Sequence, residues 1–192
     1  KKLCDQVMAD LPPEILAAPC QPFTHICVDY CAPTLVKAMA NKRAQLKVFP
    51  VVFCCVNTGA LHMELSPSYS TADFLMIYRS FCSIRGVPVK VYTDAGSNLS
   101  AAKIAVDGKP LQGDIDWSKV VNDTARAGTT WRIAPVGGQH RNGRAERCVA
   151  AFKKTMKHLH DGKQLNFAEL QTLLNMAASV INDRPLAVSH HN

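Results

Sequence analysis

Three acidic residues stand at positions where a folded chain could present them to metal ions. Asp29 and Asp94 each close an apolar, β-rich stretch, and Glu146 comes early in a helical stretch just after Gly137-Gly138. Carboxylates from three separate elements could bind two Mg²⁺ ions about 3.5–4 Å apart, which would activate a water or a 3′-hydroxyl in phosphoryl transfer. Mg²⁺ prefers oxygen ligands and keeps water and phosphate oxygens in its shell. These three acids are therefore the candidate metal ligands and catalytic residues.

Each acid also has a purely structural interpretation. An acid at the end of a strand is commonly a turn former, and Glu146 could stabilise the N-terminus of its helix. Taken singly, the three residue types favour the structural interpretation, so their sequence contexts have to decide.

A basic segment surrounds the glutamate. Between Arg132 and Lys163 the chain carries eight Lys and Arg residues against Glu146 and Asp161, and so holds +6 of the net charge of +7. Such a concentration suits a polyanion-binding surface, although a solvated helix face is the alternative for a charge run alone. Helical spacing places Lys153 and Lys157 on the face of Glu146, where lysines would hold DNA phosphates near the metals. The candidate DNA-binding residues are Asn98, Gln139, Arg141, Asn142, Arg144, Lys153 and Lys157.

Apolar patterning indicates the elements that would position these residues. Strands are expected at residues 23–30, 47–57, 60–65, 87–93 and 129–134. A capping box at Ser70–Asp73 starts a helix that Gly86 ends, and further helices are expected at 101–106, 142–160 and 167–183. The order predicts an α/β domain with a five-stranded mixed sheet flanked by helices. If the first and fourth strands are neighbours, Asp29 and Asp94 meet at one edge of the sheet.

Length and composition suit one compact domain with short appendages. The chain has 192 residues, of which 47% are hydrophobic and 19% charged, and no apolar run approaches the roughly 18 residues that a membrane span needs. It begins without Met or an apolar signal core, so residues 1–22 are expected to lead in from an upstream domain, with the core at 23–189 and an insertion at 107–128. The eight cysteines form no C-x-x-C pair, which favours reduced thiols in an intracellular protein.

The sequence around the acids resembles the integrases of retroviruses and LTR retrotransposons. Phe23–Tyr30 (FTHICVDY) is similar to the strand that carries the first aspartate, and Val91–Leu99 (VYTDAGSNL) is similar to the second-aspartate motif. Gly137–Arg147 (GGQHRNGRAER) resembles the loop and helix that carry the glutamate, and Asn182–Leu186 (NDRPL) resembles the motif that closes the last core helix. The resemblance runs from about residue 8 to 189.

Three further stretches look most like the BEL/Pao group of LTR retrotransposons. They are Met8–Pro13, Ala60–Leu65 and Ser70–Phe74. Two departures stand beside the acids: Ala95 is present where many relatives carry Asn, and 51 residues separate Asp94 from Glu146, more than the usual retroviral spacing. Neither departure removes a metal ligand.

The resemblance implies an RNase H-like fold and a polynucleotidyl transferase that uses two Mg²⁺ or Mn²⁺ ions. It implies 3′-end processing and strand transfer, double-stranded DNA (element ends and target) as partner, a homo-multimer, and action in the nucleus during integration. Two other functions stay open. One is a different RNase H-like nuclease or transposase, and the other is a domesticated DNA-binding module without catalysis, which the intact set of three acids disfavours.

Overall fold

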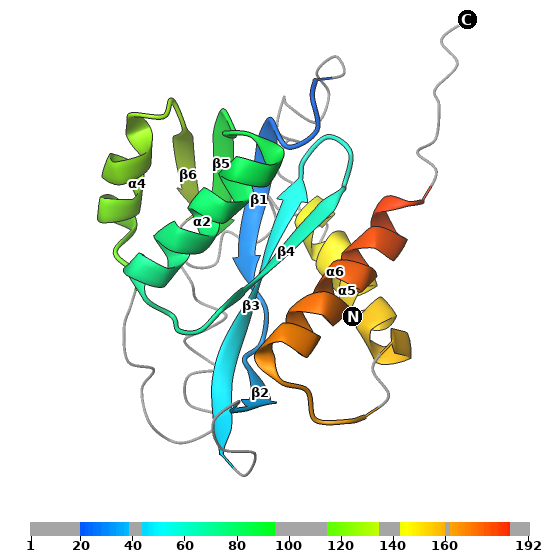
Figure 1. The fold of residues 1–192 in the computed structure, drawn as a ribbon. Coiled ribbons are helices and arrows are strands. Elements are labelled where there is room, and N and C mark those ends of the chain that lie inside the picture. The colour runs from blue at the N-terminus through cyan, green and yellow to red at the C-terminus, as the bar shows by residue number, and fades with distance from the viewer. Residues whose placement is uncertain (1–19, 39–43, 95–114, 135–142, 160–161, 185–192) are drawn as a thin grey trace, which may run out of the picture.

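The computed structural model describes residues 20–38, 44–94, 115–134, 143–159 and 162–184 (Figure 1). These residues form a mixed sheet with four helices packed on it, as the sequence predicts for an α/β domain. The strands are β1 (His25–Tyr30), β2 (Thr34–Lys37), β3 (Gln45–Cys55), β4 (Leu61–Ser66), β5 (Lys90–Asp94) and β6 (Thr130–Ala134). The helices are α2 (Thr71–Arg85), α4 (Trp117–Ala125), α5 (Gly143–Leu159) and α6 (Phe167–Asn182).

The sheet has the order β2-β3-β1-β5-β6, with β4 also paired to β3. β3 runs antiparallel to β1, β2 and β4, whereas β1, β5 and β6 are parallel to one another. Two parallel strands need a crossover connection, and the helix α2 lies in the connection between β4 and β5. The central position of β1 makes its end a fixed point of the scaffold.

Helices cover both faces of the sheet (Figure 1). One face packs an aromatic core against α2 and α4, in which Phe53 and Phe81 stack with ring centroids 4.4 Å apart. The other face packs a core of aliphatic and cysteine side chains against α5 and α6, including Phe152 and Leu174. Two separate cores of this kind are what a sheet buried on both sides requires.

The sheet has six described strands, so the prediction of five was wrong. The additional strand is β2, which pairs with the first residues of β3 from Thr34↔Val48 to Lys37↔Gln45. It is short and lies at the edge, and only Val36 among its residues is fully buried, so its sequence carries little apolar pattern. Its partner β3 accordingly begins at Gln45 rather than near residue 47.

Pro50 lies inside β3 rather than at its start. The β1 partners of β3 end at Tyr30↔Val51 and the β2 partners begin at Thr34↔Val48, so Pro50 falls where the neighbouring strand changes. Its carbonyl accepts the Cys31 N–H at 2.8 Å. A proline, which cannot donate to a ladder, is tolerated at such a changeover.

Local signals explain the helix boundaries. The Ser70 hydroxyl accepts the Asp73 N–H at 3.1 Å at the start of α2, and Gly86 ends that helix at φ 90°. Asn166 and Glu169 form a reciprocal capping box at the start of α6. The predicted helix at 101–106 lies outside the described residues. No helix among the described segments is long and apolar enough to cross a membrane.

Candidate active site and its basic flank

The two aspartates lie level with each other on neighbouring parallel strands. The register of β1 and β5 runs His25↔Lys90, Ile26↔Val91 and Cys27↔Tyr92. If this register is extended by two residues along each strand, the backbone of Asp29 falls opposite that of Asp94. The two strands are therefore neighbours, which is the condition that the sequence left open, whereas the metal-binding role of the two acids stays a prediction.

Strand alternation assigns both positions to one face of the sheet. Cys27 and Tyr92, which are partners in the register, both pack in the core beneath α5 and α6. Because side chains alternate between faces with a period of two, positions 29 and 94 belong to the same face as Cys27 and Tyr92. Position 29 thus belongs to the side of the sheet that α5 covers, and the alternation along β5 assigns position 94 to the same side.

The environment of Asp29 is partly buried, and its charge acts on two neighbouring thiols. Burial, with a smaller contribution from the Asp29 carboxylate, raises the pKa of Cys31 to about 12, and Lys153 opposes part of this increase. Burial likewise raises the pKa of Cys27 to about 12, with smaller increases from Cys148 and Asp29. Since Asp29 and Lys153 both influence Cys31, the end of β1 and the middle of α5 lie close together.

The helix α5 is held against the sheet by one apolar side. Cys148 and Phe152 are buried, and Val149, Met156 and Leu159 pack on the same core. The Cys148 thiol also donates to the Gly59 carbonyl at 3.5 Å. Glu146 lies in the first turn of α5, two residues before this anchor. The opposite side of α5, which faces away from the sheet, is exposed to solvent.

Lys153 and Lys157 are both exposed, as a DNA-contacting face requires. The other candidate contacts are less completely described. Asn98, Gln139, Arg141 and Asn142 lie outside the described residues, and only the backbone is placed for Arg144, Glu146 and Asp94. Within the described side chains no group of three His, Cys, Asp or Glu residues could hold a metal ion. Two of the three proposed ligands, Asp94 and Glu146, have side chains outside the described set, so this finding does not test the prediction.

A pocket beside this site was missed by the sequence analysis. It has a volume of about 670 Å³ and lies between the end of β1, β2, β3, α5, α6 and the loop before α6. We call it the β2–α5 pocket. Cys31, Lys153 and Lys157 line it, which makes it continuous with the surroundings of Asp29. Lys163 also lines it and, like Lys153 and Lys157, belongs to the basic segment of the sequence.

The fold defined by this sheet and these helices is that of integrase catalytic cores, the RNase H-like fold. The sequence matches no protein-family model and no curated protein. A chain of the simian T-cell lymphotropic virus intasome in complex with PP2A regulatory subunit B56 gamma is similar with a TM-score of 0.59 and 13% identity. The match covers 88% of this chain and 52% of that chain, so this chain spans about half of the intasome chain.

Isolated catalytic cores match over nearly their whole length. The catalytic core domain of BIV integrase is similar with a TM-score of 0.56 and 13% identity, over 88% of this chain and 90% of that chain. The HTLV-2 integrase catalytic core domain in complex with magnesium, in its trimeric form, has a TM-score of 0.53 and 16% identity, over 88% and 91% of the two chains. At such identities the similarity establishes the fold.

Proposed function

We propose that this chain is the catalytic domain of a retrotransposon or retrovirus-type integrase, which processes the 3′ ends of element DNA and transfers them into target DNA. The observation that carries the proposal is the level placement of Asp29 and Asp94 on adjacent parallel strands. The helix that bears Glu146 packs on the same face of the sheet. The relationship to the BEL/Pao group and action in the nucleus are part of the same proposal and rest on the sequence motifs.

The donor chemistry fits divalent metal ions. Asp29, Asp94 and Glu146 would hold two Mg²⁺ or Mn²⁺ ions, since carboxylate oxygens are the ligands that such hard cations prefer. When bound, the ions would supply activation of the attacking oxygen and stabilisation of the leaving oxygen in phosphoryl transfer. The protein's own contribution is to keep the carboxylates at fixed strand ends and on a helix anchored by Cys148 and Phe152.

Double-stranded DNA is the proposed partner. Lys153 and Lys157 are exposed on α5, and the charge of Lys153 reaches the end of β1. Lysines in this position would bind the phosphates of either DNA and hold the backbone beside the acids, without reading its sequence. The retroviral proteins with this fold are described as an intasome and as trimeric and dimeric cores.

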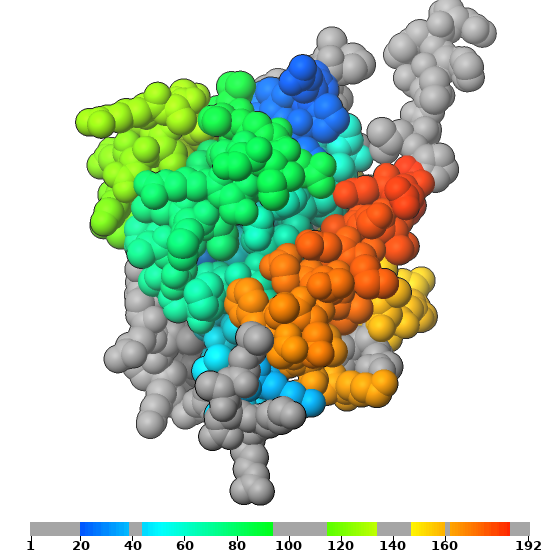
Figure 2. Space-filling model, in the orientation of Figure 1, coloured from blue at the N-terminus to red at the C-terminus, as the bar shows by residue number. Residues whose placement is uncertain are grey.

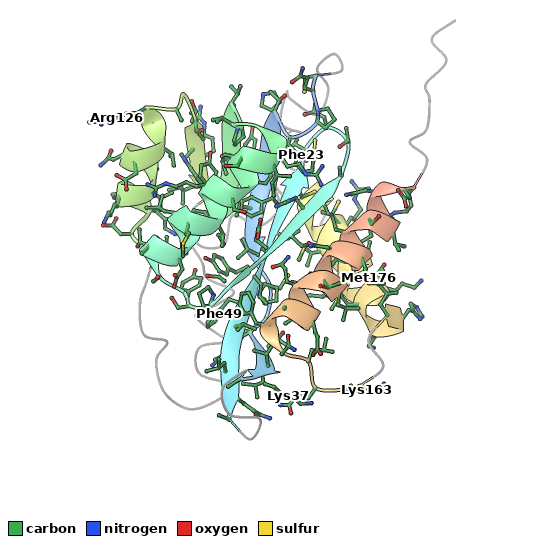
Figure 3. All side chains as sticks on the ribbon, viewed as in Figure 1. Phe23, Lys37, Phe49, Arg126, Lys163 and Met176 are labelled. Atoms are coloured by element: carbon green, nitrogen blue, oxygen red, sulfur yellow. The ribbon has the colours of Figure 1, made fainter. Side chains whose placement is uncertain are left out.

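We also propose that this chain forms a homo-multimer. The helices α2 and α6 share one face of the molecule (Figure 2). Each exposes large apolar side chains, Met76 and Ile84 on α2 and Met176 and Val180 on α6, and Met176 points away from the sheet (Figure 3). Exposed apolar groups gathered on one face favour association. Met176→Asp should therefore lower the mass measured by sedimentation, whereas Ile133→Asp on the opposite edge strand should not. An equal effect of both variants would show that this face is not the interface of the multimer.

The decisive experiment separates binding from chemistry. Asp94→Asn keeps the shape of the side chain but removes a charge that holds the metals, so strand joining with Mg²⁺ or Mn²⁺ should collapse. DNA affinity at fixed salt should persist or rise slightly because a negative charge near phosphates is gone. The assays use this chain, alone and within any longer natural protein that contains it.

The outcomes discriminate between the three functions considered. If Asp94→Asn joins DNA as well as the parent, the metal-ligand assignment is wrong. If the parent binds DNA but neither cuts nor joins it with either metal, the domesticated binding module is the better interpretation. If the parent instead hydrolyses an RNA–DNA hybrid and does not join DNA ends, a different RNase H-like nuclease is indicated.

A further inference from the structure

The β2–α5 pocket combines an apolar interior with a cationic rim. Its interior includes Val36, Phe152 and Leu174, each at most 4% exposed. Its volume of about 670 Å³ falls within the range of ligand-binding pockets. An apolar interior of this size fits a flat, weakly polar group better than it fits a hydrated ion.

The positive charge at the rim favours a ligand that carries negative charge. Lys153, Lys157 and Lys163 line the pocket, and no acidic residue is among the described residues that line it. Figure 3 shows Lys163 in the loop between α5 and α6, at the same end of the molecule as Lys37. That loop is attached to β2, since the Lys37 N–H donates to the Leu165 carbonyl at 2.8 Å. The lysine of the loop is thereby held beside the pocket.

Two acids lie close in sequence to residues that line the pocket. The Glu169 carboxylate accepts the Asn166 N–H at 2.8 Å in the capping box of α6. Asp29 lies two residues before Cys31, which lines the pocket, and its charge acts on that thiol. Asp29 therefore lies near the part of the pocket that Cys31 lines, and the three lysines supply positive charge along the lining.

We propose that the β2–α5 pocket holds an unpaired nucleotide at the end of the DNA, with its base against the apolar interior and its phosphates on the three lysines. This inference rests on the proposed function. Removal of nucleotides from the 3′ end of one strand leaves the complementary 5′ nucleotides unpaired, and such nucleotides lie next to the processed end. A base and a phosphate together have the chemistry that the pocket offers, and apolar contact with the face of a base does not depend on which base it is.

The test compares two DNA ends without metal, in EDTA. One duplex is blunt and the other is identical except for two unpaired 5′ nucleotides, and the affinities are measured by fluorescence anisotropy at fixed salt. The parent protein should bind the unpaired end roughly tenfold more tightly. A third duplex with an abasic two-nucleotide end keeps the phosphates and should lose most of this preference.

Two substitutions probe the pocket, each with a matched control. Leu35 lines the pocket, so Leu35→Trp should fill it. The control is Leu46→Trp, which introduces the same side chain at a similarly exposed leucine of the neighbouring strand that is not among the residues lining the pocket. Lys163→Gln removes a rim charge, and Lys119→Gln removes one from α4. Both pocket variants should reduce the preference to less than about threefold, and Leu35→Trp should leave blunt-end affinity within about twofold of the parent. The control variants should keep the full preference.

Three results would each overturn the inference. The first is an equal affinity of the parent for the blunt and the unpaired end. The second is an unchanged preference in a Leu35→Trp variant that has the same urea midpoint as the parent, and the third is an abasic end that binds as tightly as the complete unpaired end. Displacement by an acidic peptide, with no preference among DNA ends, would assign the pocket to a protein partner. Because the assay needs no catalysis, its failure is distinct from failure of strand joining, which the Asp94→Asn experiment measures.

Discussion

Asn182 at the end of α6 takes the place of a strand partner for β4. Its side-chain oxygen accepts the Leu61 N–H at 2.7 Å, and its side-chain nitrogen donates to the Leu61 carbonyl at 2.8 Å. Leu61 is fully buried, so water has poor access to these two backbone groups. Asn182 begins the motif Asn182–Leu186 that the sequence analysis singled out.

Replacement of Asn182 by Ala should destabilise the domain by about 3 kcal/mol. Each lost hydrogen bond contributes about 1 kcal/mol net, and a backbone group left unpaired in the interior costs about 1–3 kcal/mol. The lower half of that range applies because the asparagine itself is exposed. For a domain of this size the melting temperature should fall by roughly 6–12 °C.

Urea denaturation measures this effect directly. The midpoint should fall while the slope of the free energy of unfolding with urea stays constant, because the surface exposed on unfolding is unchanged. Asn122→Ala, on the exposed side of α4, is the control and should change stability by less than about 0.5 kcal/mol. A loss for Asn182→Ala no larger than that of the control would refute the reasoning, since it would mean that water replaces the side chain.

Two further predictions concern charge. Burial raises the pKa of Cys31 from 9.0 to about 12, so above pH 9 the unfolded chain ionises first and the free energy of unfolding falls as pH rises. Between pH 8 and 10, Cys31→Ala should remove about 1.4 kcal/mol of that fall in urea titrations, and identical pH curves for parent and variant would contradict it. Lys153→Ala with Lys157→Ala should weaken binding equally across DNA sequences and reduce the salt slope by about one unit per lost phosphate contact, whereas Lys119→Ala should not. An unchanged salt slope in the double variant would mean that these two lysines form a solvated surface that does not contact DNA.

The long elements were predictable because one pattern dominates each of them. The apolar, β-rich composition of β1 and β4 follows from burial on both faces of the sheet. The helical spacing of Phe74, Tyr78 and Phe81 in α2 follows from burial of one side of that helix. The strand β2 escaped prediction because four residues at a sheet edge bury little. Its formation depends on β3 extending past β1, which is a property of the pairing and is absent from the local sequence.

The sequence points to the candidate site residues, whose role stays a prediction, and only partly to their geometry. Strand ends point to Asp29 and Asp94, but their level placement depends on a parallel pairing between segments far apart in the chain. The β2–α5 pocket could not be derived from any window of sequence, because five elements and a loop contribute its walls. Local patterns predict elements, whereas sites between elements depend on topology.

The helix α5 shows why a fold can persist at 13–16% identity to its structural neighbours. Its buried side needs only side chains that fill the space above β1 and β3, a requirement that Cys148 and Phe152 meet here and that other apolar residues of similar volume can meet elsewhere. Its exposed side needs positive charge but no particular packing partner. Under the proposed function the three acids differ from both groups, because another residue type could not replace a carboxylate that holds a metal ion. Constraint in such a domain is therefore concentrated at a few positions, while packing tolerates change at most of the others.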